Sequence, residues 1–516
     1  MPIALALLVT IVALARGGYA AWGILALELG AAALLLWVVV EVLWGTSSAE
    51  RQHYRRQRRF RSATTDDVEI ILPGESQDEI PPKPKDRYIL LFGYPFKRTR
   101  LGLPFALLVL WIAVSLVPLD MDWLSELSPE AHALRSDAPA PAADSAPSSL
   151  APFLTLRSLW IGLACFTLVF VSAHMASSPK KIEQLSLLLF LMGIGFGLYG
   201  MAQWLFGLQE LFGRDPTTAG LRASASFGNR NHYAAFMEML LLCGLGWTGT
   251  KRAGILQTIE GRRRGLVRRI EETGGKLFFL GLGVSITAIG LIFSLSRSGI
   301  TAALAGAAVF VLLRPSPPDD AATIELSEHS GRPSRRRKPQ GLIAIALAVV
   351  GVCAWIGLDP VVHRFKLLPN EWEQERGRTL VWSDSLNAIP DYALTGSGLS
   401  TYRYVFPRYR SFGGTIAYSW AHNDYLQVLI ELGIPGSLLV LWVMATVWRR
   451  SQRVRRTLAV EPVLLHLHAG YLAACVALAL HSFTDFSLHL AANAALLSVI
   501  VGVAVGLERR DEEAVP

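Results

Sequence analysis

The sequence predicts an all-α protein that crosses a membrane many times. Its 516 residues are 52% hydrophobic and only 17% charged, and the mean hydropathy is +0.37. Soluble domains carry about 25% charged residues, so this composition excludes an ordinary soluble protein. Apolar runs of roughly 17–25 residues, the length that spans a bilayer, recur along the chain. We predict about twelve transmembrane helices, with one long and partly helical outer loop between the ninth and tenth.

Each predicted span is an apolar run bounded by polar residues. In chain order the spans are 2–15, 22–44, 101–119, 153–175, 184–206, 231–248, 276–295, 299–313, 341–358, 424–447, 462–483 and 488–506. They divide the membrane part into residues 1–44, 101–358 and 424–506. Because Met1 to Leu8 contain no Lys or Arg, the first run lacks the charged region of a cleaved signal and is expected to stay as a span.

The polar connections differ in character. Residues 45–100 form an unusually long cytoplasmic connection that we expect to be partly disordered. An outer loop over 120–152 is expected to be disordered, because it contains the low-complexity Ala/Pro/Ser stretch 137–152. The long loop 359–423 is instead rich in Trp, Tyr, Phe and Arg, so it is expected to fold. Residues 507–516 are a cytoplasmic tail.

Basic residues orient the spans. With both ends cytoplasmic, 35 of the 49 Lys and Arg fall in cytoplasmic connections, which is the positive-inside bias of membrane proteins. The net charge of +8 then belongs beside anionic lipid headgroups, and nucleic-acid binding is excluded. This orientation places 359–423 on the outer side, which is the periplasm in a Gram-negative host.

Part of the long loop is predicted to be helical. From Glu371 to about Ala388 the spacing is that of a helix, with Arg378 and Trp382 as neighbours one turn apart. Pro390 ends this helix, and the Gly396-Ser397-Gly398 sequence supplies a turn.

Notable polar residues gather at the outer ends of the spans, where charge at membrane depth marks functional candidates. They are Arg230 and His232 at the sixth span, Arg297 between the seventh and eighth, His422 and Asn423 at the tenth, and Asp485 between the eleventh and twelfth. Structural roles remain open for several of them. Arg297 is also placed to snorkel to the interface, His232 to bond a backbone group, and Asp485 to cap a helix or pair with an arginine.

The chemistry of these residue types favours an anionic substrate. His422 lies where the loop meets a span, and imidazole accepts a proton near neutral pH. The loop supplies fixed positive charge suited to phosphate from Arg376, Arg378, Arg403, Arg408 and Arg410, although each alone is also typical of a solvated basic face. Guanidinium groups can hold a phosphate group without a metal, and the outer loops show no compact set of metal ligands. We therefore expect neither a metal nor a cofactor.

Several motifs together resemble the bacterial O-antigen ligase and O-antigen polymerase family. They are Asn229-Arg230-Asn231-His232, Ser296-Arg297-Ser298-Gly299, Arg378 with Trp382 before Gly396-Ser397-Gly398, and His422 with Glu431-Leu432-Gly433-Ile434-Pro435-Gly436. The similarity covers about 185–505. It implies a metal-independent, inverting glycosyltransferase that moves a glycan from undecaprenyl pyrophosphate to an acceptor hydroxyl. The acceptor would be lipid A-core in a ligase, which we slightly favour, or a growing polysaccharide in a polymerase.

The resemblance also implies roles and a location. His422 matches the family's essential histidine, Arg297 a span-end arginine and Arg378 the loop arginine, so these three are the expected catalytic residues. Substrate binding is expected of Arg230, His232, Arg376, Arg403, Asn423 and Asp485. The protein is expected in the bacterial inner membrane, with its active site facing the periplasm.

Two other readings of the sequence are a secondary transporter and a membrane component of a polysaccharide-export system. Transporters bind substrate near the bilayer midplane, at broken helices between internal repeats. The polar residues here gather at one interface instead, and no repeat is visible in the spans. Glu238, inside the sixth predicted span, is the residue that most favours a transporter.

Overall fold

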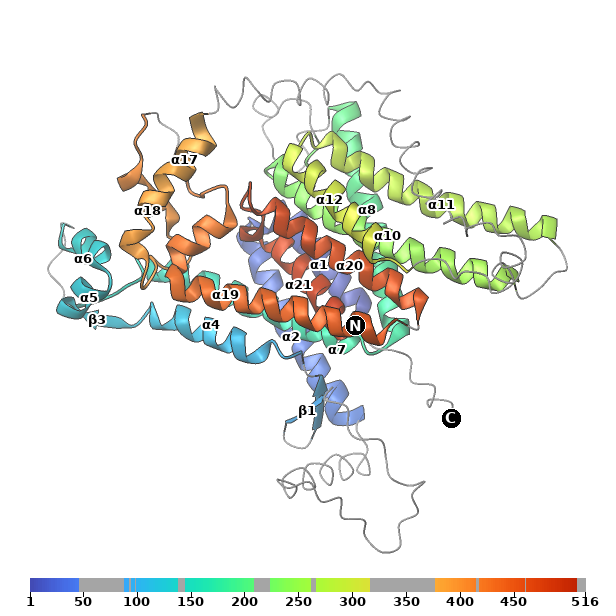
Figure 1. The fold of residues 1–516 in the computed structure, drawn as a ribbon, viewed down its shortest axis with the longest axis horizontal. Helices are drawn as coiled ribbons and strands as arrows, with labels where there is room; N and C mark the ends of the chain where they lie inside the picture. Colours follow the sequence, from blue (N-terminus) through green and yellow to red (C-terminus); the bar gives the residue numbers. More distant parts are fainter. Residues whose placement is uncertain are drawn as a thin grey trace, which may run out of the picture.

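The computed structural model describes residues 1–45, 88–91, 94–97, 99–137, 144–207, 223–260, 266–315, 376–413, 417–459 and 461–507. Over these residues the chain is a bundle of long helices with short helices at one end (Figure 1). The predicted ninth span 341–358, the loop segment 359–375, and most of the cytoplasmic connection and tail lie outside the described residues.

Eleven helices of the bundle correspond to eleven predicted spans. They are α1 (Pro2–Leu14), α2 (Ala21–Gly45), α4 (Gly102–Val114), α7 (Pro152–Met175), α8 (Pro179–Phe206), α10 (Arg230–Glu260), α11 (Leu266–Phe293), α12 (Arg297–Leu313), α19 (Asp424–Thr457), α20 (Pro462–His481) and α21 (Ala491–Gly506). A single turn of 3-10 helix, η1 (Arg16–Gly18), follows α1. The predicted all-α class of the membrane part is therefore confirmed.

Six of the described helices are long and apolar enough to cross a bilayer. They lie at Ala21–Val42, Pro152–Met175, Pro179–Phe206, Gly274–Phe293, Asp424–Thr457 and Pro462–His481. Four shorter apolar helices are α1, α4, α12 and α21, and α10 belongs to neither group. The chain is thus a multi-pass membrane protein, while the number of twelve spans stays a prediction.

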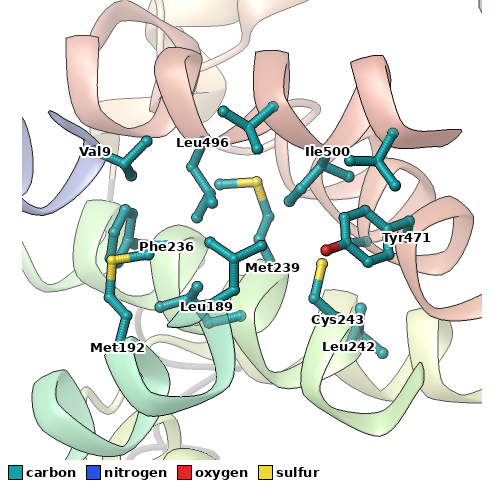
Figure 2. Packing of buried hydrophobic residues seen from close by; sticks show 14 of the residues in the cluster. Val9, Leu189, Met192, Phe236, Met239, Leu242, Cys243, Tyr471, Leu496 and Ile500 are labelled. Carbon is teal, nitrogen blue, oxygen red and sulfur yellow. The ribbon is translucent and has the colours of Figure 1, made fainter. Parts of the chain in front are cut away.

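Apolar side chains from five helices meet in the centre of the bundle. Figure 2 shows Val9 of α1 and Leu189 of α8 facing Phe236 of α10, with Tyr471 of α20 and Leu496 of α21 completing the layer. Helices α10 and α20 approach closely where two glycines meet. A Cβ added to Gly246 would lie only 2.9 Å from the Cα of Gly470, so neither position has room for a side chain.

Helix α19 is bent near its outer end. Gly433 has φ 67° and ψ −174°, a conformation that favours glycine, and Pro435 follows within the same element. The indole nitrogen of Trp111 on α4 donates to the carbonyl oxygen of Leu432 at 2.9 Å, so α4 bonds the carbonyl beside the bend. The bend lets the loop around Gly396 pack directly on the α19 backbone. A Cβ at Gly396 would lie 2.3 Å from the backbone carbonyl oxygen of Glu431.

The long loop folds as expected over its described part. Helix α17 (Arg376–Asn387) begins the described segment, the 3-10 turn η3 (Pro390–Tyr392) follows, and α18 (Tyr402–Tyr409) comes after the glycine turn. The predicted helix over 371–388 is therefore confirmed from residue 376 onward. The loop has its own apolar core, which includes Val381, Ala388, Tyr392, Tyr402, Val405 and Phe406.

The prediction of disorder over 120–152 is wrong for the described residues of that segment. Strands β3 (Pro118–Asp120) and β4 (Ser145–Pro147) pair in antiparallel register and flank the helices α5 (Met121–Leu127) and α6 (Pro129–Ser136). The Arg135 guanidinium donates to the carbonyl oxygens of Pro147 at 2.9 Å and Ser149 at 2.7 Å, and the Leu150 amide donates to Ser397 O at 2.9 Å. Contacts with distant residues supply the order that the local composition does not.

A second small hairpin lies between α2 and α4. Strand β1 (Tyr88–Leu91) pairs with β2 (Tyr94–Lys97) in antiparallel register. In Figure 1, α17, α18, α5 and α6 lie beyond one end of the bundle, while α10 and α11 extend past the other. The described part of the folded loop therefore lies at one end of the bundle.

Candidate active site

The site is built around Asp485, in the turn between α20 and α21. Its side chain is fully buried, and four polar side chains from other parts of the chain surround it. Asn231 Nδ2 donates to Asp485 Oδ2 at 2.5 Å. His422 Nδ1 and His232 Nε2 lie 3.7 and 3.8 Å from Oδ1, and Arg378 Nη2 lies 3.6 Å from Oδ2. The Asp485 carboxylate is thus the point where side chains from the start of α10, from α17 and from the residues just before α19 come together.

The surroundings of Asp485 favour its charged form. Burial alone would raise the pKa of this carboxyl, but the facing His422 outweighs it, together with the charges of His232 and Arg378. The net result is a pKa held well below the usual range of an aspartate. Asp485 is therefore an anion throughout the neutral pH range, able to stabilise positive charge on its neighbours.

His422 occupies a strained position at the start of α19. Its φ of 52° lies in the left-handed region, which histidine enters more readily than most residues. The next residue, Asn423, caps α19 by accepting from the Leu426 amide at 3.0 Å. With Nδ1 toward Asp485 and a quarter of the side chain exposed, the imidazole keeps access to solvent. Its ring packs edge-on against Phe486 at 4.9 Å.

Helix α17 joins the loop to this cluster through two residues one turn apart. Arg378 Nη1 donates to the carbonyl oxygen of Thr484 at 3.1 Å, in addition to facing Asp485. Trp382 Nε1 donates to the carbonyl oxygen of Ala421 at 2.9 Å, directly before His422. Because their i, i+4 spacing puts Arg378 and Trp382 on one face of α17, this helix contacts both the turn that carries Asp485 and the residue before His422.

The first residues of α10 face Asp485 from another side of the cluster. Arg230 is the first residue of that helix, and the Asn229 side chain accepts from the Asn231 amide at 2.9 Å. His232 is buried and packs edge-on against Phe486, with 4.5 Å between ring centroids. His422 and His232 thus flank the same phenyl ring and the same carboxylate oxygen. Their facing nitrogens, Nδ1 and Nε2, are buried without a hydrogen-bond partner among the described residues.

Arg297 lies at the same end of the bundle, as the first residue of α12. The Ser296 side chain caps this helix by accepting from the Gly299 amide at 3.3 Å. Gly299 lets the first turn pack tightly, because a Cβ there would meet Ala234 Cβ at 2.5 Å and His481 Cε1 at 3.4 Å. The turn that carries Arg297 therefore abuts both α10 and the end of α20.

Four predicted substrate-binding residues are not among the side chains described above around Asp485, and one of them is Arg230 at the start of α10. Asn423 serves as the α19 cap, Arg376 begins α17, and Arg403 is exposed on α18. Of the other loop arginines, Arg408 pairs with Glu130 at 2.7 Å and Arg410 lies over the rings of Phe412 and Tyr418.

Sequence reasoning missed a second polar network beside the cluster. His489 Nδ1 and Asp424 Oδ1 lie 2.9 Å apart, and Gln427 Nε2 bonds both His489 Nε2 at 3.1 Å and Glu431 Oε1 at 2.9 Å. The amides of Ser400 and Tyr402 donate to Glu431 at 2.8 and 3.1 Å, which ties α19 to the loop. The available signal was the spacing of Asp424, Gln427 and Glu431, which puts three polar residues on one helix face.

The network also shifts the pKa of His489, in the turn before α21. Burial would lower the pKa of this imidazole, but the adjacent Asp424 carboxylate raises it overall. No group of three or more His, Cys, Asp or Glu side chains in the part of the chain that the structure describes is arranged to hold a metal ion.

Part of the chain is similar to a known protein family. Residues 282–441 match a family model described as O-antigen ligase. The matched region runs from α11 into α19 and contains Arg297, Arg378 and His422. No curated protein matches the chain. Over these residues the chain is similar to the O-antigen ligase family, which agrees with the resemblance of its motifs.

Proposed function

We propose that the protein transfers a glycan from undecaprenyl pyrophosphate to an acceptor hydroxyl at the periplasmic face of the bacterial inner membrane. The observation that carries the proposal is the convergence of His422, Arg378 and His232 on the buried Asp485 carboxylate. Arg378 lies on α17 in the loop, His422 lies two residues before α19, and His232 lies on α10. The three side chains meet at the covered end of the bundle. The family match supports the same reaction class.

His422 is the general base in this proposal. Its Nδ1 faces Asp485, which leaves Nε2 for the acceptor hydroxyl. As the acceptor oxygen bonds to the anomeric carbon, His422 Nε2 takes the hydroxyl proton, and the Asp485 carboxylate stabilises the imidazolium that forms. A positioned base of this kind contributes typically about 10²–10⁴-fold in rate. Attack opposite the leaving group inverts the anomeric configuration.

The arginines take up the charge of the leaving group. The bond between the anomeric carbon and the pyrophosphate oxygen breaks, and the electron pair leaves with the pyrophosphate. Arg378 and Arg297 are proposed to bind this pyrophosphate through paired hydrogen bonds. Arg230 and Arg376, the first residues of α10 and α17, are proposed as further contacts to it. His232, Asn423 and Arg403 are proposed contacts to the glycan or the acceptor. No metal is required.

The acceptor is proposed to be lipid A-core, as in a ligase, with the related polysaccharide polymerase using the same donor chemistry. Both reactions place a hydroxyl group at His422, so this site serves either. The reaction product separates them. A ligase joins the glycan to the core lipid, whereas a polymerase joins two lipid-linked glycans.

The test is transfer by the purified chain in nanodiscs. The protein is given a glycan linked to undecaprenyl pyrophosphate, with either lipid A-core or a second lipid-linked glycan as acceptor, and products are identified by mass spectrometry. We expect a covalent glycan product and release of undecaprenyl pyrophosphate, both unchanged by excess EDTA. Absence of product with every acceptor would overturn the proposal. Loss of activity in EDTA, restored by magnesium or manganese, would overturn the arginine mechanism.

A further inference from the structure

A buried carboxylate–imidazole pair lies directly beneath the candidate site and has no part in the chemistry proposed above. Glu238 is on α10 and His481 is the last residue of α20. His481 Nδ1 and Glu238 Oε2 lie 3.1 Å apart, and both side chains are completely buried. This pair links the two helices that meet closely at Gly246 and Gly470.

Fold stability does not explain the pair. Glu238 lies eight residues into α10, about 12 Å along the helix from its start, where an ionisable side chain is costly. Replacing a buried ion pair by apolar residues of similar size is often neutral or stabilising. A pair kept at this depth is therefore better explained by the geometry it imposes on its surroundings.

His481 contacts both halves of the site. Its carbonyl oxygen accepts from the Thr484 amide at 2.9 Å and from the Thr484 hydroxyl at 3.1 Å. Thr484 in turn receives Arg378 on its carbonyl oxygen and directly precedes Asp485. The imidazole ring lies against the first turn of α12 at Gly299, two residues after Arg297.

We propose that Glu238 is a positioning residue that acts through His481. The pair fixes the imidazole between α10, the first turn of α12 and the Ser482–Asp485 turn. It thereby holds Asp485, which faces the base, in register with Arg297, which is assigned to the leaving group. This inference rests on the proposed function, since the pair is proposed to hold the residues of that same site in position.

The pair is intolerant of single replacements. Glu238 Oε1 and His481 Nε2 are buried without a hydrogen-bond partner among the described residues. Removing one partner would leave the other as a lone polar group inside the bundle, which is far more destabilising than removing both. The decisive variant is therefore the double apolar replacement Glu238→Leu/His481→Leu.

The chain offers a matched control on the same helix. His468 is also fully buried in α20, where its Nε2 bonds Ser451 Oγ at 3.0 Å and Ala504 O at 3.1 Å. It lies thirteen residues from His481, about 20 Å away toward the opposite end of the bundle. The control variant Ser451→Ala/His468→Leu removes a buried imidazole and its side-chain partner without approaching the site.

The experiment compares both double variants with the wild-type chain in nanodiscs. Melting temperature, kcat for transfer and donor affinity are measured. Hydrogen exchange at the Thr484 amide is followed in the absence of substrate. We expect Glu238→Leu/His481→Leu to melt near the wild-type temperature. Its kcat should fall on the order of a hundredfold, as for a misplacement of about 1 Å, with faster exchange at Thr484. The control should retain kcat within about threefold.

A folded Glu238→Leu/His481→Leu protein with near-normal kcat and unchanged Thr484 exchange would overturn the inference. An equal loss in both double variants would overturn it too. If this variant fails to fold, Glu238→Gln keeps the shape and one acceptor oxygen. Wild-type kcat in Glu238→Gln then contradicts the inference, and a tenfold loss at unchanged melting temperature supports it. An inactive wild-type chain would instead count against the proposed function, while Thr484 exchange still reports on the pair.

Discussion

Two polar regions lie side by side at the covered end of the bundle, and they differ in how completely their groups are bonded. In the network of Asp424, Gln427, Glu431 and His489, the side chains meet at hydrogen-bond distances of 2.9 to 3.1 Å. In the cluster around Asp485, the carboxylate accepts from Asn231 Nδ2 at 2.5 Å and from the Phe486 amide at 2.9 Å, but two imidazoles and a guanidinium stand 3.6 to 3.8 Å from it. Catalytic hydrogen bonds are often this long before substrate binds.

From this difference we infer a structural role for the network and a role in the reaction for the cluster. A closed network leaves no atom for a substrate, so its value lies in holding α19, the loop and the turn before α21 together. The open cluster has ion-pair distances and a partly exposed histidine, so it retains room to respond to a ligand. Substitutions in the cluster should therefore affect the reaction, and substitutions in the network should affect stability first.

The largest expected effect comes from Asp485, because three basic groups depend on it. Asp485→Asn keeps the shape but removes the charge facing His422, His232 and Arg378. We expect transfer to fall by more than a hundredfold while the protein remains folded, since an uncharged amide no longer stabilises an imidazolium. The measurement is kcat in nanodiscs with circular dichroism as the folding control. A loss below tenfold would contradict the central place given to this carboxylate.

Arg378 comes next. Its guanidinium bonds Thr484 O and faces Asp485, and its proposed ligand is the pyrophosphate. Arg378→Ala should cost about 2.7–4 kcal/mol of transition-state stabilisation, equivalent to at least a hundredfold in rate, and should weaken donor binding. Arg378→Lys should recover little, because lysine lacks the planar fork. Full activity in the lysine variant would show that a point charge suffices.

Glu431 tests the closed network. This buried carboxylate accepts from Gln427 and from the amides of Ser400 and Tyr402. Glu431→Leu leaves those donors unpaired, at a cost of about 1–3 kcal/mol of unfolding free energy. Limited proteolysis should then cut within 390–413 more readily than in the wild type. If Glu431→Leu instead lost kcat while its melting temperature stayed near that of the wild type, Glu431 would belong with the cluster around Asp485.

The two regions should respond to pH in opposite directions. The lowered pKa of Asp485 means that its contribution to stability is full above about pH 4 and is lost as the pH falls through the native value. The raised pKa of His489 means that its contribution is full below about pH 6.5 and is lost as the pH rises through the native value. Melting temperatures of His489→Gln and the wild type should therefore converge on the alkaline side. A gap that widens with rising pH would contradict this sign.

The smallest effect is expected at Arg408. Its guanidinium pairs with Glu130 at the surface of the outer loop, and both side chains are partly exposed. Such pairs contribute about 0–1 kcal/mol, so Arg408→Ala should leave kcat within about twofold and change the melting temperature slightly. A tenfold loss of transfer would place Arg408 among the substrate contacts.

Much of this arrangement could be predicted from the sequence. Apolar runs predicted the helices, and the distribution of Lys and Arg predicted that Arg230, Arg297, His422 and Asp485 share one end of the bundle. The structure brings the starts of α10, α12 and α19 together with the Asp485 turn at one end of the bundle. Motif order then pointed to a family that the match over 282–441 confirms.

The remaining features depend on contacts between distant residues. Asp485 seemed equally suited to cap a helix, and only its packing against α10 and α17 shows it as the centre of the cluster. The described part of segment 120–152 is tied to the rest of the protein by the hydrogen bond between Leu150 and Ser397. The Ala/Pro/Ser composition of the segment does not predict this bond. The pairing of Asp424 with His489 likewise joins the beginnings of two spans that no spacing rule connects.

The central claim is that His422 and Asp485 act as one unit in deprotonating the acceptor. Its most direct test is a double-mutant cycle in which transfer and donor affinity are measured for His422→Ala, Asp485→Asn and the combined variant. We predict that His422→Ala slows transfer by about 10²–10⁴-fold yet binds donor nearly as well as the wild type, and that adding Asp485→Asn slows the remaining transfer little further. Near-normal turnover by folded His422→Ala, or losses that multiply in the combined variant, would contradict the account.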